Sequence, residues 1–96
     1  MPSYRVTMTI GMLRPGAAPE RVLPTAADAA AELVTVEASD IGIVAGAPRI
    51  MVRFEAEDAE IARQVAGHVV AATSAVAEPL VSKLTERVGG RWYVVR

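Results

Sequence analysis

A strict alternation of apolar and polar residues near the start of the chain constrains the fold more than any other feature. Over residues 4–10 the even positions are apolar, namely Tyr4, Val6, Met8 and Ile10. The odd positions carry arginine or threonine, namely Arg5, Thr7 and Thr9. A period of two is typical of a strand that buries one face only. Such a strand belongs in an antiparallel sheet with a core on one side. Gly11 and the loop residues Arg14, Pro15 and Gly16 are expected to end it.

Two further strands are predicted in the middle of the chain. Residues 49–55 alternate cleanly, with apolar side chains at Ile50, Val52 and Phe54. Residues 35–44 also read as extended, but their alternation slips around Ser39 and Asp40, which predicts a bulge there. A turn at residues 46–48, Gly-Ala-Pro, would join the two strands as a hairpin.

A first helix is predicted from Thr25 to about Leu33, because Thr25 and Asp28 have capping-box spacing ahead of an alanine run. Pro24 is expected to interrupt any single helix that starts at Pro19, which leaves a short turn or a kinked extension before it. Its expected apolar face consists of Leu23, Ala26, Ala27, Ala30, Leu33 and Val34.

A second helix is marked by Asp58 at an N-cap position and Glu60 in the first turn. Apolar residues then recur at intervals of three or four and form a stripe for packing on a sheet: Ile61, Val65, Val69, Ala72 and Val76. Pro79 is expected to end this helix.

Two readings of residues 80–88 stay open. As a strand, residues 81–88 pair with residues 91–95 through a two-residue turn at Gly89 and Gly90, and Arg87 faces Trp92 in a possible cation–π pair. As a helix, the segment starts at Pro79 and ends at Gly89. The valine and threonine content and the glycine pair favour the strand.

This order of elements predicts an α+β domain over residues 1–96 with the ferredoxin-like split βαβ layout (β-α-β-β-α-β). Its antiparallel sheet would have the first and third strands at the centre and both helices on one face, plus a short C-terminal edge strand within residues 91–96. A layout of this kind hosts many unrelated functions, so it predicts no activity.

Composition argues against several classes of function. The chain has no cysteine, so disulfides, thiolate metal sites and cysteine nucleophiles are absent. A formal net charge of −1 lacks the basic excess of nucleic-acid binders. We expect no membrane partner and a cytoplasmic location, because we find neither a signal pattern nor a long apolar run.

The side of the sheet without helices is the predicted binding surface. It would present Arg5, Thr7, Thr9, Arg49, Met51 and Arg53. The absence of stacking aromatic residues there argues against binding of single-stranded RNA. Three interpretations remain: a self-association surface, a plainly solvated face, or a small-anion site that uses Arg5, Arg49 and Arg53. Trp92 and Tyr93 are either interface anchors or a cover for one end of the core.

No catalytic residue, metal site or cofactor is predicted. His68 is the only histidine, and its helical neighbours include no carboxylate. The acids at residues 55–60 suit a helix start, and Glu37 and Asp40 suit an edge strand. Arg14, Pro15 and Gly16 make a poor phosphate cradle, because proline lacks the N–H donor.

The resulting hypothesis is a non-enzymatic interaction module that self-associates as a homo-oligomer through the open sheet face or the terminal strand. The alternative is a small enzyme or ligand-binding protein whose pocket forms between subunits. The ligand itself is unknown in either case.

Overall fold

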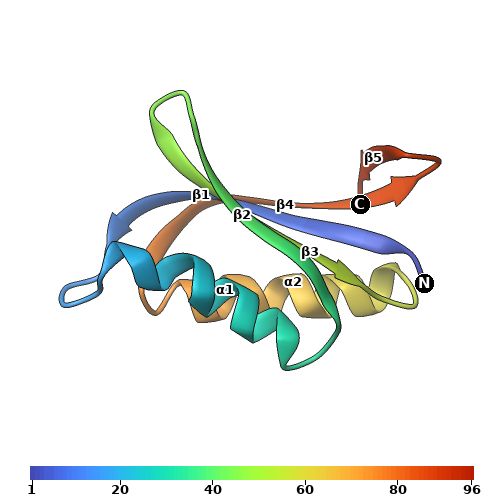
Figure 1. The fold of residues 1–96 in the computed structure, drawn as a ribbon, viewed down its shortest axis with the longest axis horizontal. Coiled ribbons are helices and arrows are strands. Elements are labelled where there is room, and N and C mark those ends of the chain that lie inside the picture. Colours follow the sequence, from blue (N-terminus) through green and yellow to red (C-terminus); the bar gives the residue numbers. More distant parts are fainter.

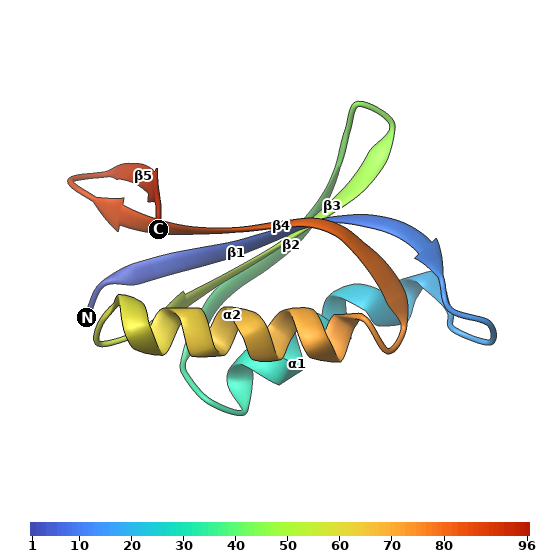
Figure 2. The same ribbon diagram turned by 180° about the vertical axis from the view of Figure 1, so that it is seen from behind.

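The computed structural model describes all 96 residues and has two layers, a sheet and a pair of helices (Figures 1 and 2). The sheet is antiparallel, has five strands in the order β2-β3-β1-β4-β5, and carries both helices on one face. The α+β prediction is therefore confirmed. The elements in chain order are β1 (Ser3–Leu13), the 3₁₀ turn η1 (Pro19–Arg21), α1 (Val22–Ala31), β2 (Val36–Val44), β3 (Ala47–Glu55), α2 (Ala59–Thr73), β4 (Ala77–Val88) and β5 (Arg91–Val94).

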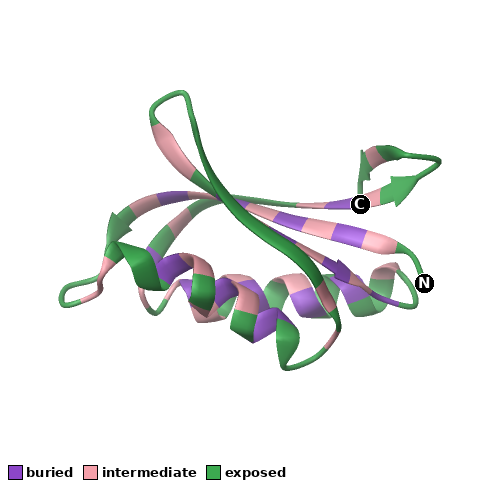
Figure 3. Ribbon diagram, viewed as in Figure 1, coloured by how far each residue is buried: buried purple, intermediate pink, exposed green.

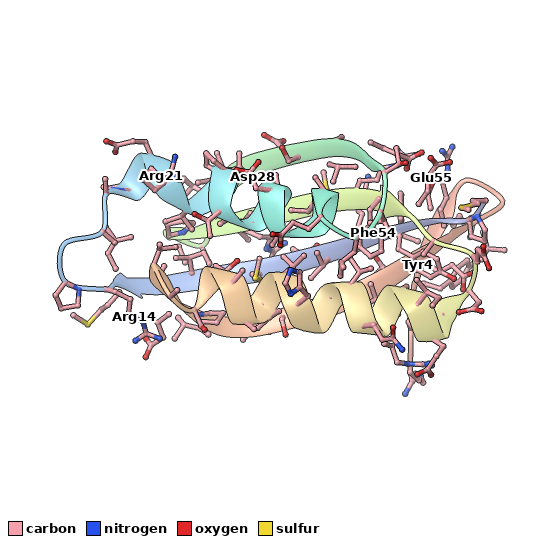
Figure 4. All side chains as sticks on the ribbon, turned by 90° about the horizontal axis from the view of Figure 1, so that it is seen from below. Tyr4, Arg14, Arg21, Asp28, Phe54 and Glu55 are labelled. Carbon is pink, nitrogen blue, oxygen red and sulfur yellow. The ribbon has the colours of Figure 1, made fainter.

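The alternation in β1 sets the core, as predicted. Its even residues from Tyr4 to Ile10 are buried beneath the helices and its odd residues from Ser3 to Gly11 are half-buried, which gives the banding of β1 in Figure 3. β1 pairs with β3 so that Val6 lies opposite Val52 and Met8 opposite Ile50. Figure 4, seen from the helix side, places Tyr4 close to Phe54, and their ring centroids lie 6.0 Å apart. These buried pairs fix which face of the sheet remains open.

β1 continues past Gly11 to Leu13, so the prediction that Gly11 ends the strand was wrong. Its last residues pair with the start of β4, where the register shifts twice. A Cβ atom on Gly11 would lie 2.8 Å from a carboxylate oxygen of Glu78 and 3.0 Å from Cγ of Leu80. Glycine therefore lets the β4 side chains pack over this end of β1.

α1 begins at Val22, three residues before the predicted start at Thr25. Pro24 falls in the first helical turn, where its missing N–H would have no intrahelical partner, so it does not break the helix. The turn η1 occupies the segment before it. No side chain caps the helix. Leu33 lies beyond the last helical residue and is 54% exposed, so the predicted apolar face was wrong at that end.

The predicted cap of α2 is confirmed, since Oδ1 of Asp58 accepts the Ile61 N–H at 2.9 Å. The buried stripe is Ala62, Val65, Val69 and Thr73, whereas Ile61 is 37% exposed. The helix ends at Thr73, well before Pro79. The Thr73 hydroxyl donates to the Val69 carbonyl at 2.8 Å, a local bond that competes with helix continuation.

The hairpin of β2 and β3 departs from prediction in two details. Its register shift lies between Val36 and Ala38, at Glu37, and not at Ser39 and Asp40. The turn consists of Ala45 and Gly46, both with positive φ, at 52° and 80°. Positive φ at both positions is typical of the two-residue hairpin turn whose twist matches that of the flanking strands. Ala47 and Pro48 therefore belong to β3.

Residues 80–88 form a strand, so the helical alternative was wrong. β4 starts at Ala77, and Pro79 lies within it at a register shift. Gly89 and Gly90 have φ of 57° and 82° and form the predicted turn into β5, with Arg87 opposite Trp92. The tip of this hairpin and that of β2 and β3 both project away from the helices (Figures 1 and 2).

Candidate functional site

The predicted surface residues lie together on the sheet face that the helices do not cover. Strand register pairs Arg5 with Arg53, Thr7 with Met51, and Thr9 with Arg49. Each alternates with buried residues of its strand, so its side chain faces away from the core. We call this surface the open face.

β4 adds residues to the open face that the sequence analysis did not include. Val81, Lys83 and Thr85 pair with β1 residues whose side chains lie on this side. The sequence left residues 80–88 open between helix and strand, so these three side chains could not be assigned to a face. Once β4 is a strand beside β1, its odd positions must share the face of Thr7 and Thr9.

One half of the open face is covered from within the chain. The indole of Trp92, on β5, lies over the guanidinium of Arg5 at 3.9 Å and near that of Arg53 at 5.3 Å from the ring centroid. The predicted cation–π partner, Arg87, is the cross-strand neighbour of Trp92, but these two arginines are the ones that contact its ring. The β4–β5 hairpin therefore brings the indole back across the sheet.

Glu37 completes this covered half. Its Oε1 accepts a bond from Nε of Arg53 at 2.9 Å. A hydrogen bond from the Ser3 side chain, together with the bond and charge of Arg53, lowers the pKa of the Glu37 carboxyl below its ordinary value. The bulge at Glu37 in β2 accounts for this contact, because it turns an edge residue toward the neighbouring strand. We call Arg5, Glu37, Arg53 and Trp92 the covered half.

The other half of the open face has no such internal partners. Thr7, Thr9, Arg49, Val81 and Lys83 line a shallow hollow of about 110 Å³. The ion pairs of the chain join Arg53 to Glu37, Arg63 to Glu60 and His68 to Glu32, so Arg49 and Lys83 are in none of them. We call the five residues that line the hollow the open half.

The two predicted interface anchors have different positions. Trp92 is half-buried against the arginines of its own chain. Tyr93, the next residue, is 52% exposed and pairs with Glu86 of β4. Consecutive residues of a strand point to opposite faces, so only the tyrosine ring is left without a partner on the chain.

His68 has a partner that the sequence analysis did not find. Its Nε2 lies 2.7 Å from Oε1 of Glu32, which follows α1. Both side chains are exposed, and no group of three or more potential metal ligands exists in the chain. Arg14 is also engaged in the fold, because its Nε donates to the Ser74 carbonyl at 2.9 Å. Both pairs join residues distant in sequence, where helical spacing gives no signal.

Comparisons with known proteins identify no relative: no family model, no curated protein and no solved structure matches this chain. Neither helix combines the length and the apolar character needed to cross a membrane.

Proposed function

We propose that this chain is a small non-enzymatic binding module that self-associates by packing its open face against that of a second copy. The observation that supports this most is one row of side chains across the sheet. Register places Asp40, Met51, Thr7 and Lys83 side by side on β2, β3, β1 and β4. The row begins with an acid, ends with a base and is uncharged between them.

Such a row complements itself. Consider a two-fold axis that runs parallel to the strands, between the two packed sheets and above the space between β3 and β1. This axis reverses the order of the four residues in the second copy. Asp40 of one copy then faces Lys83 of the other, and Met51 faces Thr7. Two antiparallel sheets pack face to face about 10 Å apart with their strands roughly aligned, which keeps such facing pairs within side-chain reach. A two-fold interface requires this self-complementarity.

The shape of the sheet also favours a partner on this face. Both hairpin tips rise from the same side and flank the open face (Figure 2). Met51 is half-buried at the centre of the open face, and Val81, which lines the hollow, is 64% exposed. A mixed polar and apolar surface is ordinary for an interface that is not permanent.

For the fold we propose the ferredoxin-like layout, with β5 as an addition at one edge. The order β2-β3-β1-β4 and the two helices that connect β1 to β2 and β3 to β4 support it. This assignment is independent of the proposed self-association.

A charge exchange tests the interface. We expect wild-type protein to sediment as a dimer at micromolar concentration. Asp40→Lys and Lys83→Asp each place like charges opposite one another, and each should weaken dimerisation about tenfold or more. The double variant restores the pairing and should recover most of the loss. Two weak single variants and an equally weak double variant would contradict the two-fold arrangement.

A matched pair of methionine variants separates the open face from other surfaces. Met51→Arg should disrupt the dimer, whereas Met12→Arg, at an exposed end of β1, should not. Circular dichroism would verify that both variants fold. A dimer that survives Met51→Arg would place association elsewhere, for example at the outer edge of β4, where β5 pairs only with Thr85–Val88.

A further inference from the structure

The hollow in the open half has the chemistry of an anion site. We infer that Arg49, Lys83, Thr7 and Thr9 bind a tetrahedral oxyanion, phosphate or the phosphate group of a small molecule. The hollow that these residues share with Val81 has a volume of about 110 Å³. The site lies on a single copy of the chain, so it does not depend on the proposed dimer.

The register brings two cations to opposite sides of one strand of hydroxyls. Arg49 is the cross-strand neighbour of Thr9 on β3, and Lys83 is the neighbour of Thr7 on β4. Strands are about 4.8 Å apart, so β3 and β4 are separated by about 10 Å across β1. Long arginine and lysine side chains can both reach a ligand that sits over the threonines between them.

The four polar side chains offer hydrogen-bond donors, and none of them carries a negative charge. Arginine has a planar fork of N–H donors, lysine has three N–H donors, and each threonine hydroxyl donates once. None of the four side chains makes a hydrogen bond to another protein group, and neither cation is in an ion pair. Two positive charges suit a phosphate dianion better than a single carboxylate.

The nearest acids do not occupy the hollow. Asp40 accepts the N–H of Ile41 at 2.8 Å, and Glu37 is bonded to Arg53. Glu78 lies against Gly11, which is two residues along β1 from Thr9. Its carboxylate is a negative charge at this end of β1, so Glu78→Gln should tighten binding.

In the proposed dimer, Asp40 of the second copy lies opposite Lys83, whereas no acid lies opposite Arg49. The row next to the central one consists of Gly42, Arg49, Thr9 and Val81, and it contains no acid. Gly42 has no side chain to fill the space above its own position. An arginine confined between two sheets without a counter-charge is costly, and a bound oxyanion supplies that charge.

The test is an NMR titration of the wild-type chain with inorganic phosphate, with chloride at the same ionic strength as the blank. We expect saturable amide shifts concentrated at Thr7, Thr9 and Lys83. A parallel titration with glycerol phosphate shows whether the ligand is free phosphate or a phosphate group on a small molecule. Glycerol phosphate that binds more tightly than inorganic phosphate indicates an organic phosphate, and weaker binding indicates the free ion.

Variants test whether phosphate binds in the hollow. Arg49→Gln should weaken phosphate binding about tenfold or more, and Thr9→Val should weaken it several-fold. Arg21→Gln removes an exposed arginine on the helix side (Figure 4) and should leave the affinity unchanged. No saturable shift, or an equal loss for Arg21→Gln and Arg49→Gln, would overturn the inference. Sedimentation on the same samples separates this outcome from failure of the dimer.

Discussion

Both halves of the open face carry arginine, but the arginines of the covered half have partners within the chain and the arginine of the open half has none. In the covered half, Arg5 and Arg53 lie against the Trp92 ring, and Arg53 also bonds to Glu37. In the open half, Arg49 and Lys83 flank threonines and contact no acid. Arginine and threonine on a strand therefore do not identify a binding surface by themselves. The partners that other segments bring decide which residues remain free.

Chemically similar residues therefore have different roles in the two halves. We expect the arginines of the covered half to contribute to stability, because both guanidinium groups contact the Trp92 ring and Arg53 also pairs with Glu37. We expect the cations of the open half to contribute little to stability, because they are in no ion pair, which leaves them available to a ligand or a second copy. Substitutions in the two halves should accordingly differ in what they change.

The largest stability effect should come from Trp92. Trp92→Ala removes a half-buried indole and its contacts with two guanidinium groups, and should lower the free energy of unfolding by about 2 kcal/mol. Urea denaturation measures this loss. Tyr93→Ala is the matched control on the same strand, where we expect a change below about 0.5 kcal/mol. Equal losses at both positions would remove the distinction between covered and open halves.

A smaller effect is expected at the Glu37–Arg53 pair. Arg53→Gln should cost about 0.5–1 kcal/mol and raise the pKa of Glu37 toward its ordinary value. A lowered folded pKa contributes stability at neutral pH that is lost as the pH falls through that folded pKa, so the variant should lose less stability on acidification. Carboxyl NMR titration and acid unfolding check both points. Arg49→Gln should leave the Glu37 titration unchanged.

The smallest effect is expected at the threonines of the open half. Thr9→Val keeps the branched shape and removes a hydroxyl that has no partner in the chain, so the free energy of unfolding should change by less than about 0.5 kcal/mol. Thermal unfolding suffices to measure it. A large loss would mean that this hydroxyl serves the fold, as the covered half does.

Local patterns predicted the parts of the molecule that depend on local physics. The alternation of Tyr4 to Ile10, the Asp58 cap and the Gly89–Gly90 turn each involve neighbouring residues, and each is present. The predicted turn at residues 46–48 was displaced because Ala45 adopts a positive φ, which alanine disfavours. Nothing in the local sequence indicates that conformation.

Hydrophobic periodicity could not predict contacts between residues that are distant in the sequence. The position of Trp92 over Arg5 joins opposite ends of the chain, and the His68–Glu32 pair joins two helices. The six predicted surface residues do share one face, but the sequence could not separate them into halves. That separation depends on the β4–β5 hairpin and on the bulge at Glu37.

An intermolecular NOE measurement tests most directly whether the open face packs against that of a second copy. In an equal mixture of ¹³C-labelled and unlabelled chains, we predict a contact between the Met51 methyl of one copy and the Thr7 methyl of the other. Intermolecular contacts confined to the helices or to the strand edges, or a chain that stays monomeric at NMR concentration, would contradict packing through the open face.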